Sequence, residues 1–173
     1  MTVTDRPAWE GTEVYSGTVS NDWIDINDHM NVAYYVLAFD LGIDSLWTRF
    51  GLTDERISRE ASSTFAVECH VTWQREMLVD AAFCITSQIL AYDAKRIHQF
   101  MRMYSVADGY LAATAEWMNL HIDLGTRRVA PWPDDVRANI DEFAASQAGL
   151  TMPEEAGRRV RVKKPERAAA GYP

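Results

Sequence analysis

Residues 23–31, WIDINDHMN, bring two carboxylates, a histidine and two asparagines together just before the chain becomes strongly apolar. The carboxylate of Asp25 could attack a carbonyl carbon as a nucleophile or activate water as a general base. His29 could orient Asp25 or contact a substrate, and Asn31 could position either group. Amide N–H groups at a helix start could hold the negative oxygen that such a reaction creates. This segment is therefore a candidate catalytic site.

The same residues also suit a purely structural purpose, because Asp and Asn are common helix N-caps. Asn27, Asp28 or Asn31 could cap the helix that follows, which would leave Asp25 without that duty. His29 could equally fix the loop through a local hydrogen bond. Both interpretations depend on a helix that starts near residue 31.

The pattern of apolar residues predicts that helix over residues 31–50, because they recur at helical spacing. The opposite side of the same stretch is also apolar, and such a helix is normally buried on most sides. Gly51 directly follows and is a natural C-terminal stop.

The rest of the chain is rich in strand signals. Residues 63–74 alternate apolar and polar side chains over ten positions, as in a strand with one buried face. Short turns at 92–95 and 107–109 predict an antiparallel meander of consecutive strands. The predicted strands cover residues 13–20, 63–74, 81–90, 96–106 and 110–123, and a terminal helix covers 131–146. One sheet must then curl around the long helix, which gives an α+β fold.

Composition narrows the class of protein. The chain has 173 residues, enough for one domain with a real core, and its hydrophobic and charged fractions are ordinary for a globular protein. No stretch approaches the ~18 apolar residues that span a bilayer, and the N-terminus does not resemble a secretory signal. Cys69 and Cys84 lack metal-ligand spacing and are predicted to be reduced core thiols of a cytoplasmic protein. The sequence shows no compact cluster of His, Asp and Glu, so we predict no metal site.

Charge is distributed unevenly along the chain. Residues 1–153 hold 11 Lys and Arg against 22 Asp and Glu, whereas residues 154–173 hold 6 against 3. The acidic body argues against nucleic acid as a partner. We predict a single domain over residues 1–147 and a polar, basic, flexible tail over 148–173. A docking arm for an acidic group is the alternative for this tail.

The arrangement of a curled antiparallel sheet around a central helix resembles the hotdog fold. Residues 23–31 are similar to the helix-start motif of acyl-CoA thioesterases of the 4-hydroxybenzoyl-CoA type. In that family an aspartate stands four residues before the histidine of a Gly-His-(Val/Met)-Asn segment, and Asp25 matches it. The family usually has Gly where this chain has Asp28, and Asp tolerates left-handed backbone better than most residues.

A second segment narrows the resemblance. Residues 95–123 are similar to betainyl-CoA thioesterases of carnitine breakdown. The matching positions are Lys95, Arg96, Ile97, His98, Phe100, Met103, Gly109, Leu111, Ala113, Thr114, Glu116, His121 and Asp123. The resemblance implies hydrolysis of an acyl-CoA, with betainyl-CoA as a candidate substrate. It also implies a site shared across a homodimer or dimer of dimers.

The resemblance suggests which other residues meet the substrate. A trimethylammonium acyl group would favour aromatic faces and nearby carboxylates. The candidates for acyl binding are Trp23, Asp28, Tyr34, Tyr35, Glu68 and Trp73, although core packing or solvation could explain each of them. Coenzyme A carries phosphates, for which Lys95 and Arg96 are the candidate ligands.

Two rival functions stay open at this point. A hydratase could use the same fold with different acid and base residues, and a non-catalytic protein could bind acyl-CoA without turning it over. For the leading interpretation we expect no metal or redox cofactor, no nucleic acid and no membrane, with coenzyme A entering only as part of the substrate.

Overall fold

The computed structural model describes residues 9–164 and 166–171. Its elements are β1 (Thr12–Thr18), the 3₁₀ helix η2 (Asn21–Trp23), α1 (Val32–Arg49), α2 (Asp54–Glu60), β2 (Ser62–Trp73), β3 (Ala82–Tyr92), β4 (Arg96–Ser105), β5 (Leu111–Asp123), β6 (Arg128–Val129) and α3 (Asp134–Ser146). The predicted long helix, five strands and terminal helix are all present. The short helix α2 lies between the predicted elements and was not among them.

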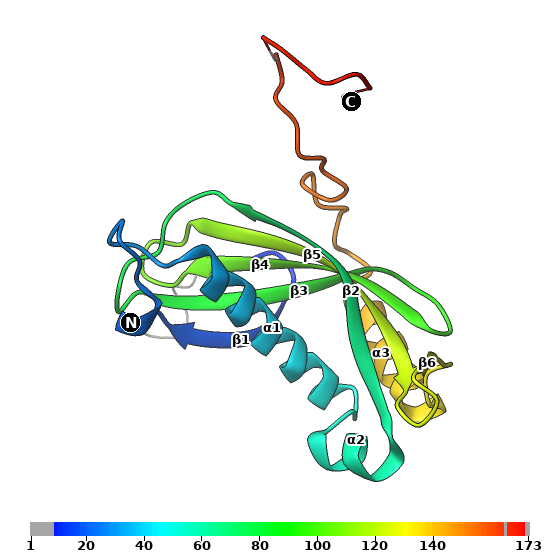
Figure 1. Ribbon diagram of the computed structural model, residues 1–173. Helices are drawn as coiled ribbons and strands as arrows, with labels where there is room; N and C mark the ends of the chain where they lie inside the picture. The colour runs from blue at the N-terminus through cyan, green and yellow to red at the C-terminus, as the bar shows by residue number, and fades with distance from the viewer. Residues whose placement is uncertain (1–8, 165, 172–173) are drawn as a thin grey trace.

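All strands join one antiparallel sheet with the order β1-β3-β4-β5-β2, and β6 pairs with β5. The sheet is curved, and α1 crosses its concave face (Figure 1). This arrangement confirms the predicted α+β class. The predicted meander holds for β3, β4 and β5 but is wrong for β2, which pairs with β5 at the far edge. The connection over residues 74–81 is too long for a tight hairpin and carries the chain from one edge strand to the interior of the sheet.

Helix α1 packs on the sheet through one stripe of its surface. The buried residues are Tyr35, Ala38, Phe39, Gly42, Ile43, Leu46 and Trp47. At Gly42 a Cβ atom would lie 2.9 Å from Met101 Cε and 3.3 Å from Ile85 Cγ2, so the missing side chain lets the helix approach the strands closely. The helix is not buried on most sides as predicted, because Val32 and Leu37 remain exposed.

Both ends of α1 are defined by local chemistry. Asn31 is the N-cap, and its side-chain oxygen accepts a hydrogen bond from the N–H of Ala33 at 3.0 Å. At the other end, Gly51 has a φ of 92°, as expected for the predicted C-terminal stop.

The convex outer face of the sheet is partly covered by both ends of the described chain. Trp9 stacks on Tyr104 with ring centroids 5.5 Å apart. Gln88 of β3 donates from Nε2 to the carbonyl oxygen of Thr151 at 2.9 Å, and Pro153 is buried. The first part of the predicted tail thus lies against the sheet. The flexibility of the tail stays a prediction, and its residues 165 and 172–173 lie outside the described residues.

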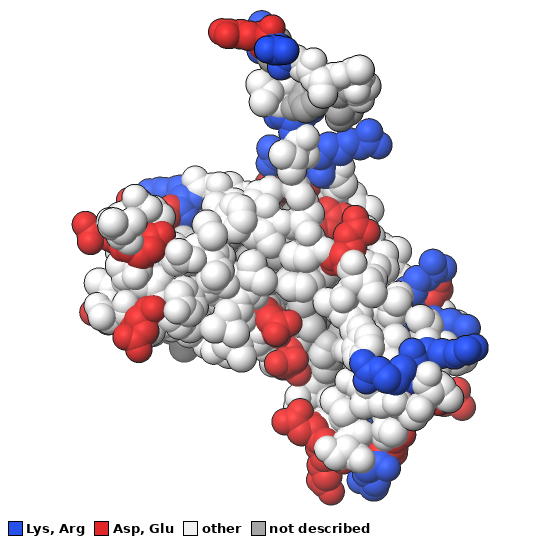
Figure 2. All heavy atoms as spheres, viewed as in Figure 1, with Lys and Arg blue, Asp and Glu red and all other residues white. Residues whose placement is uncertain are grey.

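The surface agrees with the charge pattern of the sequence. Basic side chains gather at the base of the C-terminal extension and again on the side of the body where β6 lies, whereas acidic side chains are scattered over the body (Figure 1 and Figure 2). Within the described residues, no helix is long and apolar enough to cross a membrane. Cys84 is buried as predicted, but Cys69 is exposed because β2 forms an edge of the sheet.

Candidate active site

The loop before α1 closes on itself through backbone hydrogen bonds. Ile24 and Met30 form a β-bridge, and the N–H of Asp25 donates to the carbonyl of His29 at 3.0 Å. The N–H of Asp28 donates to the carbonyl of Asp25 at 3.0 Å. Asp28 has a φ of 61°, so it adopts the left-handed conformation for which the related family uses glycine.

The side chain of Asp25 is held at both carboxylate oxygens. Oδ1 accepts the N–H of Asn27 at 2.8 Å, and Oδ2 faces the Nδ2 donor of Asn31 at 3.4 Å. Because Asn31 caps α1, Asp25 has no capping duty. The carboxylate is 19% exposed, so it is oriented by donors and still reachable by a small molecule. This geometry suits a general base or nucleophile.

His29 connects Asp25 to a cavity. Its Nδ1–H donates to the carbonyl of Met30 at 3.2 Å, and the same nitrogen lies 3.9 Å from Asp25 Oδ1. The cavity has a volume of about 210 Å³. It is lined by His29, Met30, Val32, Tyr35, Trp73, Gln74, Arg75 and Glu76. We call it the inner cavity. Asp25 is not among its lining residues but adjoins it through His29.

The start of α1 supplies a free backbone donor beside this cavity. The N–H of Ala33 is engaged by the side chain of Asn31, and the N–H of Tyr34 by its carbonyl. For the N–H of Val32 we find no acceptor among the described residues. Val32 lines the inner cavity, and its amide lies at the positive end of the helix dipole. It is a candidate donor to an oxyanion.

The segment after β2 is tied to the Asp25 loop. The N–H of Met30 donates to the carbonyl of Met77 at 2.8 Å, and the N–H of Met77 donates to the hydroxyl oxygen of Tyr35 at 2.9 Å. Burial raises the pKa of Tyr35, which keeps the phenol neutral. Tyr110 adds a hydrogen bond from its hydroxyl to the carbonyl of Glu76 at 2.8 Å. These contacts fix the cavity wall relative to the loop.

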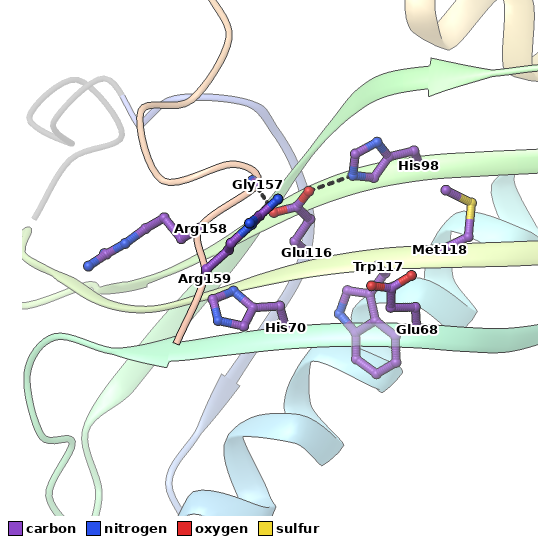
Figure 3. Close-up of a pocket in the computed structure, with 9 residues that line it drawn as sticks. All are labelled: Glu68, His70, His98, Glu116, Trp117, Met118, Gly157, Arg158 and Arg159. Carbon is purple, nitrogen blue, oxygen red and sulfur yellow. Dashed lines mark hydrogen bonds and ion pairs between the residues drawn. The ribbon is translucent and has the colours of Figure 1, made fainter. Parts of the chain in front are cut away.

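The predicted acyl-binding residues fall into separate places. Tyr35 and Trp73 line the inner cavity. Trp23 and Tyr34 stack on each other with ring centroids 5.4 Å apart, and Asp28 is exposed. Glu68 lies on the outer face of the sheet, in a different cavity (Figure 3). The assignment of these residues to substrate binding stays a prediction.

The predicted coenzyme A ligands lie far from Asp25. The first residues of β3 lie near the Asp25 loop, and Lys95 and Arg96 follow the other end of this strand. The 11 residues of β3 therefore separate Lys95 and Arg96 from Asp25. Arg96 Nη2 is also engaged by Asp93 at 2.6 Å. Arg75 is the cation beside the inner cavity, where its guanidinium lies 3.9 Å from the centroid of the Tyr110 ring. Whether Lys95 or Arg96 contacts coenzyme A stays a prediction.

The interpretation from sequence missed the backbone of Met77 and the side chain of Gln74 as parts of this site. The sequence does carry a signal, because the polar run Gln74-Arg75-Glu76 directly follows the end of a strand. Among the described residues, no group of three or more His, Cys, Asp or Glu side chains could hold a metal ion. That the reaction needs no cofactor remains a prediction.

A curled antiparallel sheet with one long helix on its concave face is the hotdog class of fold. The family described as the thioesterase-like superfamily matches residues 19–140. The chain belongs to this family, and its fold is the hotdog fold that the resemblance predicted.

Relatives extend this assignment. Betainyl-CoA thioesterase from Pseudomonas aeruginosa is 32% identical over 144 residues, which cover 83% of this chain and 91% of that protein. An L-carnitine dehydrogenase/betainyl-CoA thioesterase from Rhizobium meliloti is 35% identical over 146 residues, 84% of this chain but 29% of that protein. Among solved structures, a hypothetical protein from Staphylococcus aureus in complex with CoA has a TM-score of 0.83 and 29% identity. That match covers 90% of this chain and 99% of the other.

The tether between Tyr35 and Met77 makes a testable contribution. Tyr35→Phe removes the acceptor and leaves the N–H of Met77 buried without a partner, so the free energy of unfolding should fall by about 1–3 kcal/mol. Urea denaturation measures this change. Tyr15→Phe is the matched control, because its hydroxyl makes no hydrogen bond within the described part of the chain. Equal stability of the two variants would contradict the importance of the tether.

Proposed function

We propose that this protein hydrolyses an acyl-CoA thioester to a free acid and CoA, with Asp25 as the catalytic carboxylate. The observation that carries the proposal is that Asn31 caps α1, so that the carboxylate of Asp25 is not used as a cap and stays oriented and accessible. Membership of the thioesterase-like superfamily supports it, as do the names of the relatives.

The chemistry follows from the geometry. As a general base, Asp25 takes a proton from water while the water oxygen bonds to the thioester carbon. The N–H of Val32 donates to the carbonyl oxygen as it gains negative charge. The carbon–sulfur bond then breaks, and CoA leaves as a thiolate that takes up a proton. The alternative, in which Asp25 attacks the carbon itself and the anhydride is hydrolysed, uses the same residues.

His29 and Asn31 are positioning residues in this mechanism. Asn31 Nδ2 faces one oxygen of Asp25, and His29 stands between the carboxylate and the inner cavity. No step requires a metal or a redox cofactor, since the base, the oxyanion donor and water suffice.

Asp25→Asn tests the central assignment. Asparagine keeps an oxygen for the N–H of Asn27 but turns an amide donor towards Asn31 Nδ2, so the loop should persist while the free energy of unfolding falls by about 0.5–1.5 kcal/mol. The catalytic carboxylate is lost, so kcat should fall by about 10²- to 10⁴-fold. Thiol release from a panel of acyl-CoAs measures the rate. A folded variant with near-normal activity would show that Asp25 is structural, and a wild type that releases no thiol would favour a non-catalytic protein or a hydratase.

We further propose betainyl-CoA as the substrate and carnitine breakdown as the context. Two relatives carry betainyl-CoA thioesterase in their names. Two aromatic residues, Tyr35 and the 47% exposed Trp73, line the inner cavity together with Glu76. Aromatic faces and a carboxylate together suit a trimethylammonium group. In this proposal Glu76 takes the part that the sequence suggested for Asp28 or Glu68, whose contact with substrate stays a prediction.

The charge preference can be measured with a neutral isostere. We expect kcat/KM for betainyl-CoA to exceed that for 3,3-dimethylbutyryl-CoA by roughly tenfold to a few hundredfold, because only the former carries the cation. Glu76→Gln should reduce this ratio, whereas Glu55→Gln, an exposed carboxylate on α2, should leave it unchanged. Equal rates on both substrates would leave a general short-chain thioesterase.

We also propose a cytoplasmic homodimer, or dimer of dimers, in which β2 pairs with β2 of a second copy. The outer edge of this 12-residue strand has no partner in the described chain, and an open edge of this length invites pairing. Val67 on β2 is 56% exposed, and Val32, which lines the inner cavity, is 51% exposed, so both leave apolar surface open. A second copy would cover this surface and complete the site.

Light scattering tests the assembly. The wild type should have a mass of about two or four times 19.6 kDa at micromolar concentration. Val67→Lys should shift the mass towards one chain, because charge on an edge strand opposes pairing. Val129→Lys, at an exposed valine of β6, should retain the assembly. A monomeric wild type would refute the pairing.

A further inference from the structure

A second cavity lies on the outer face of the sheet, beneath the C-terminal segment (Figure 3). Its volume is about 330 Å³. Strands β2, β4 and β5 form its floor, and the chain after α3 forms one wall. It is lined by Glu68, His70, His98, Glu116, Trp117, Met118, Gly157, Arg158 and Arg159. We call it the outer pocket.

The C-terminal segment is attached to the sheet at this pocket. The N–H of Gly157 donates to Glu116 Oε2 at 2.7 Å, and His98 Nε2–H donates to Glu116 Oε1 at 2.7 Å. Both oxygens of this carboxylate therefore have a donor, which reduces its repulsion towards another anion. The same contact places Arg158 and Arg159 at the wall of the pocket.

The arginines of this wall differ from most arginines of the body. Arg56, Arg59, Arg96, Arg102 and Arg137 each form an ion pair with Asp or Glu. Arg158 and Arg159 form none with the described residues, and the same is true of the nearby Arg161, Lys163 and Lys164. Blue atoms at the base of the extension in Figure 2 mark this concentration of basic charge. Unpaired guanidinium groups beside a cavity favour an anionic ligand with several oxygens.

We propose that the outer pocket binds the phosphate-bearing nucleotide end of an acyl-CoA, with Arg158 and Arg159 contacting the phosphates. This inference rests on the proposed function. The acidic body, with 11 basic against 22 acidic residues over 1–153, repels a polyanionic substrate unless a basic site opposes that field. The unpaired arginines of the C-terminal segment provide such a site.

Strand β2 connects the outer pocket with the inner cavity. His70 and Thr72 lie on the outer side of β2, opposite to Cys69, which pairs with the core residue Trp117. Gln74 follows the end of the strand, and its side-chain amide hydrogen-bonds with the hydroxyl of Thr72 at 2.7 Å. His70 lines the outer pocket and Gln74 lines the inner cavity. Four residues of strand span about 13 Å. The flexible pantetheine arm of CoA can follow this path and bring the thioester to the Asp25 loop.

The test is the double variant Arg158→Gln/Arg159→Gln. KM for the best acyl-CoA substrate should rise about tenfold or more, while kcat stays unchanged, because the phosphates do not take part in the reaction. The KM for the corresponding acyl-pantetheine, which lacks the nucleotide, should not change. The matched control is Arg59→Gln/Arg137→Gln, which removes the same charge from exposed arginines elsewhere. An equal rise in KM for the control would show a general effect of net charge and overturn the site.

Binding of adenosine 3′,5′-bisphosphate, measured by calorimetry, separates the pocket from the proposed reaction. The wild type should bind this nucleotide, and the Arg158/Arg159 variant should bind it at least about tenfold more weakly. If the nucleotide binds in this way but no acyl-CoA is hydrolysed, the proposed function fails and the pocket stands. Unchanged nucleotide binding in the variant would overturn the pocket. The pocket would also be overturned if the variant bound adenosine 3′,5′-bisphosphate as the wild type does and lost only the binding of a single-stranded oligonucleotide. That result would indicate an arm for nucleic acid.

Discussion

The hydrogen bond from the N–H of Met30 to the carbonyl of Met77 joins two parts of the chain that the site requires together. One part is the loop that carries Asp25, and the other is the connection between β2 and β3 that forms the wall of the inner cavity. Tyr35 strengthens the junction by accepting the N–H of Met77 from within α1. A shift of this connection would move the cavity away from the carboxylate, so the site depends on backbone groups as much as on side chains.

A second constraint is the assignment of polar groups at the start of α1. A helix start needs a capping oxygen, and a hydrolytic site needs a carboxylate and a free amide. Asn31 meets the first need with Oδ1 and holds Asp25 with Nδ2, while the amide of Val32 remains unused among the described residues. A similar arrangement occurs on the outer face, where both carboxylate oxygens of Glu116 accept hydrogen bonds while Arg158 and Arg159 form no ion pair with the described residues.

The sequence by itself determined most of the elements and the place of the candidate site. Alternation over residues 63–74 marked β2, and helical spacing after Asn31 marked α1, because these periodicities reflect which side of each element meets the core. The stop at Gly51 followed from residue type, and the left-handed geometry at Asp28 from the resemblance, because the family usually has glycine there. The spacing of Asp25, His29 and Asn31 identified a catalytic candidate and left open which residue caps the helix.

Only the tertiary structure decided what lies beside what. The pairing of β2 with β5 instead of β3 left β2 at an edge, which exposed Cys69. It also placed Lys95 and Arg96 at the far end of the sheet from Asp25, and the C-terminal arginines beside β2. Sequence periodicity specifies the faces of an element, but strand order depends on contacts between residues far apart in the chain. Those contacts, such as Met30 with Met77, are backbone interactions that leave no signature in residue type.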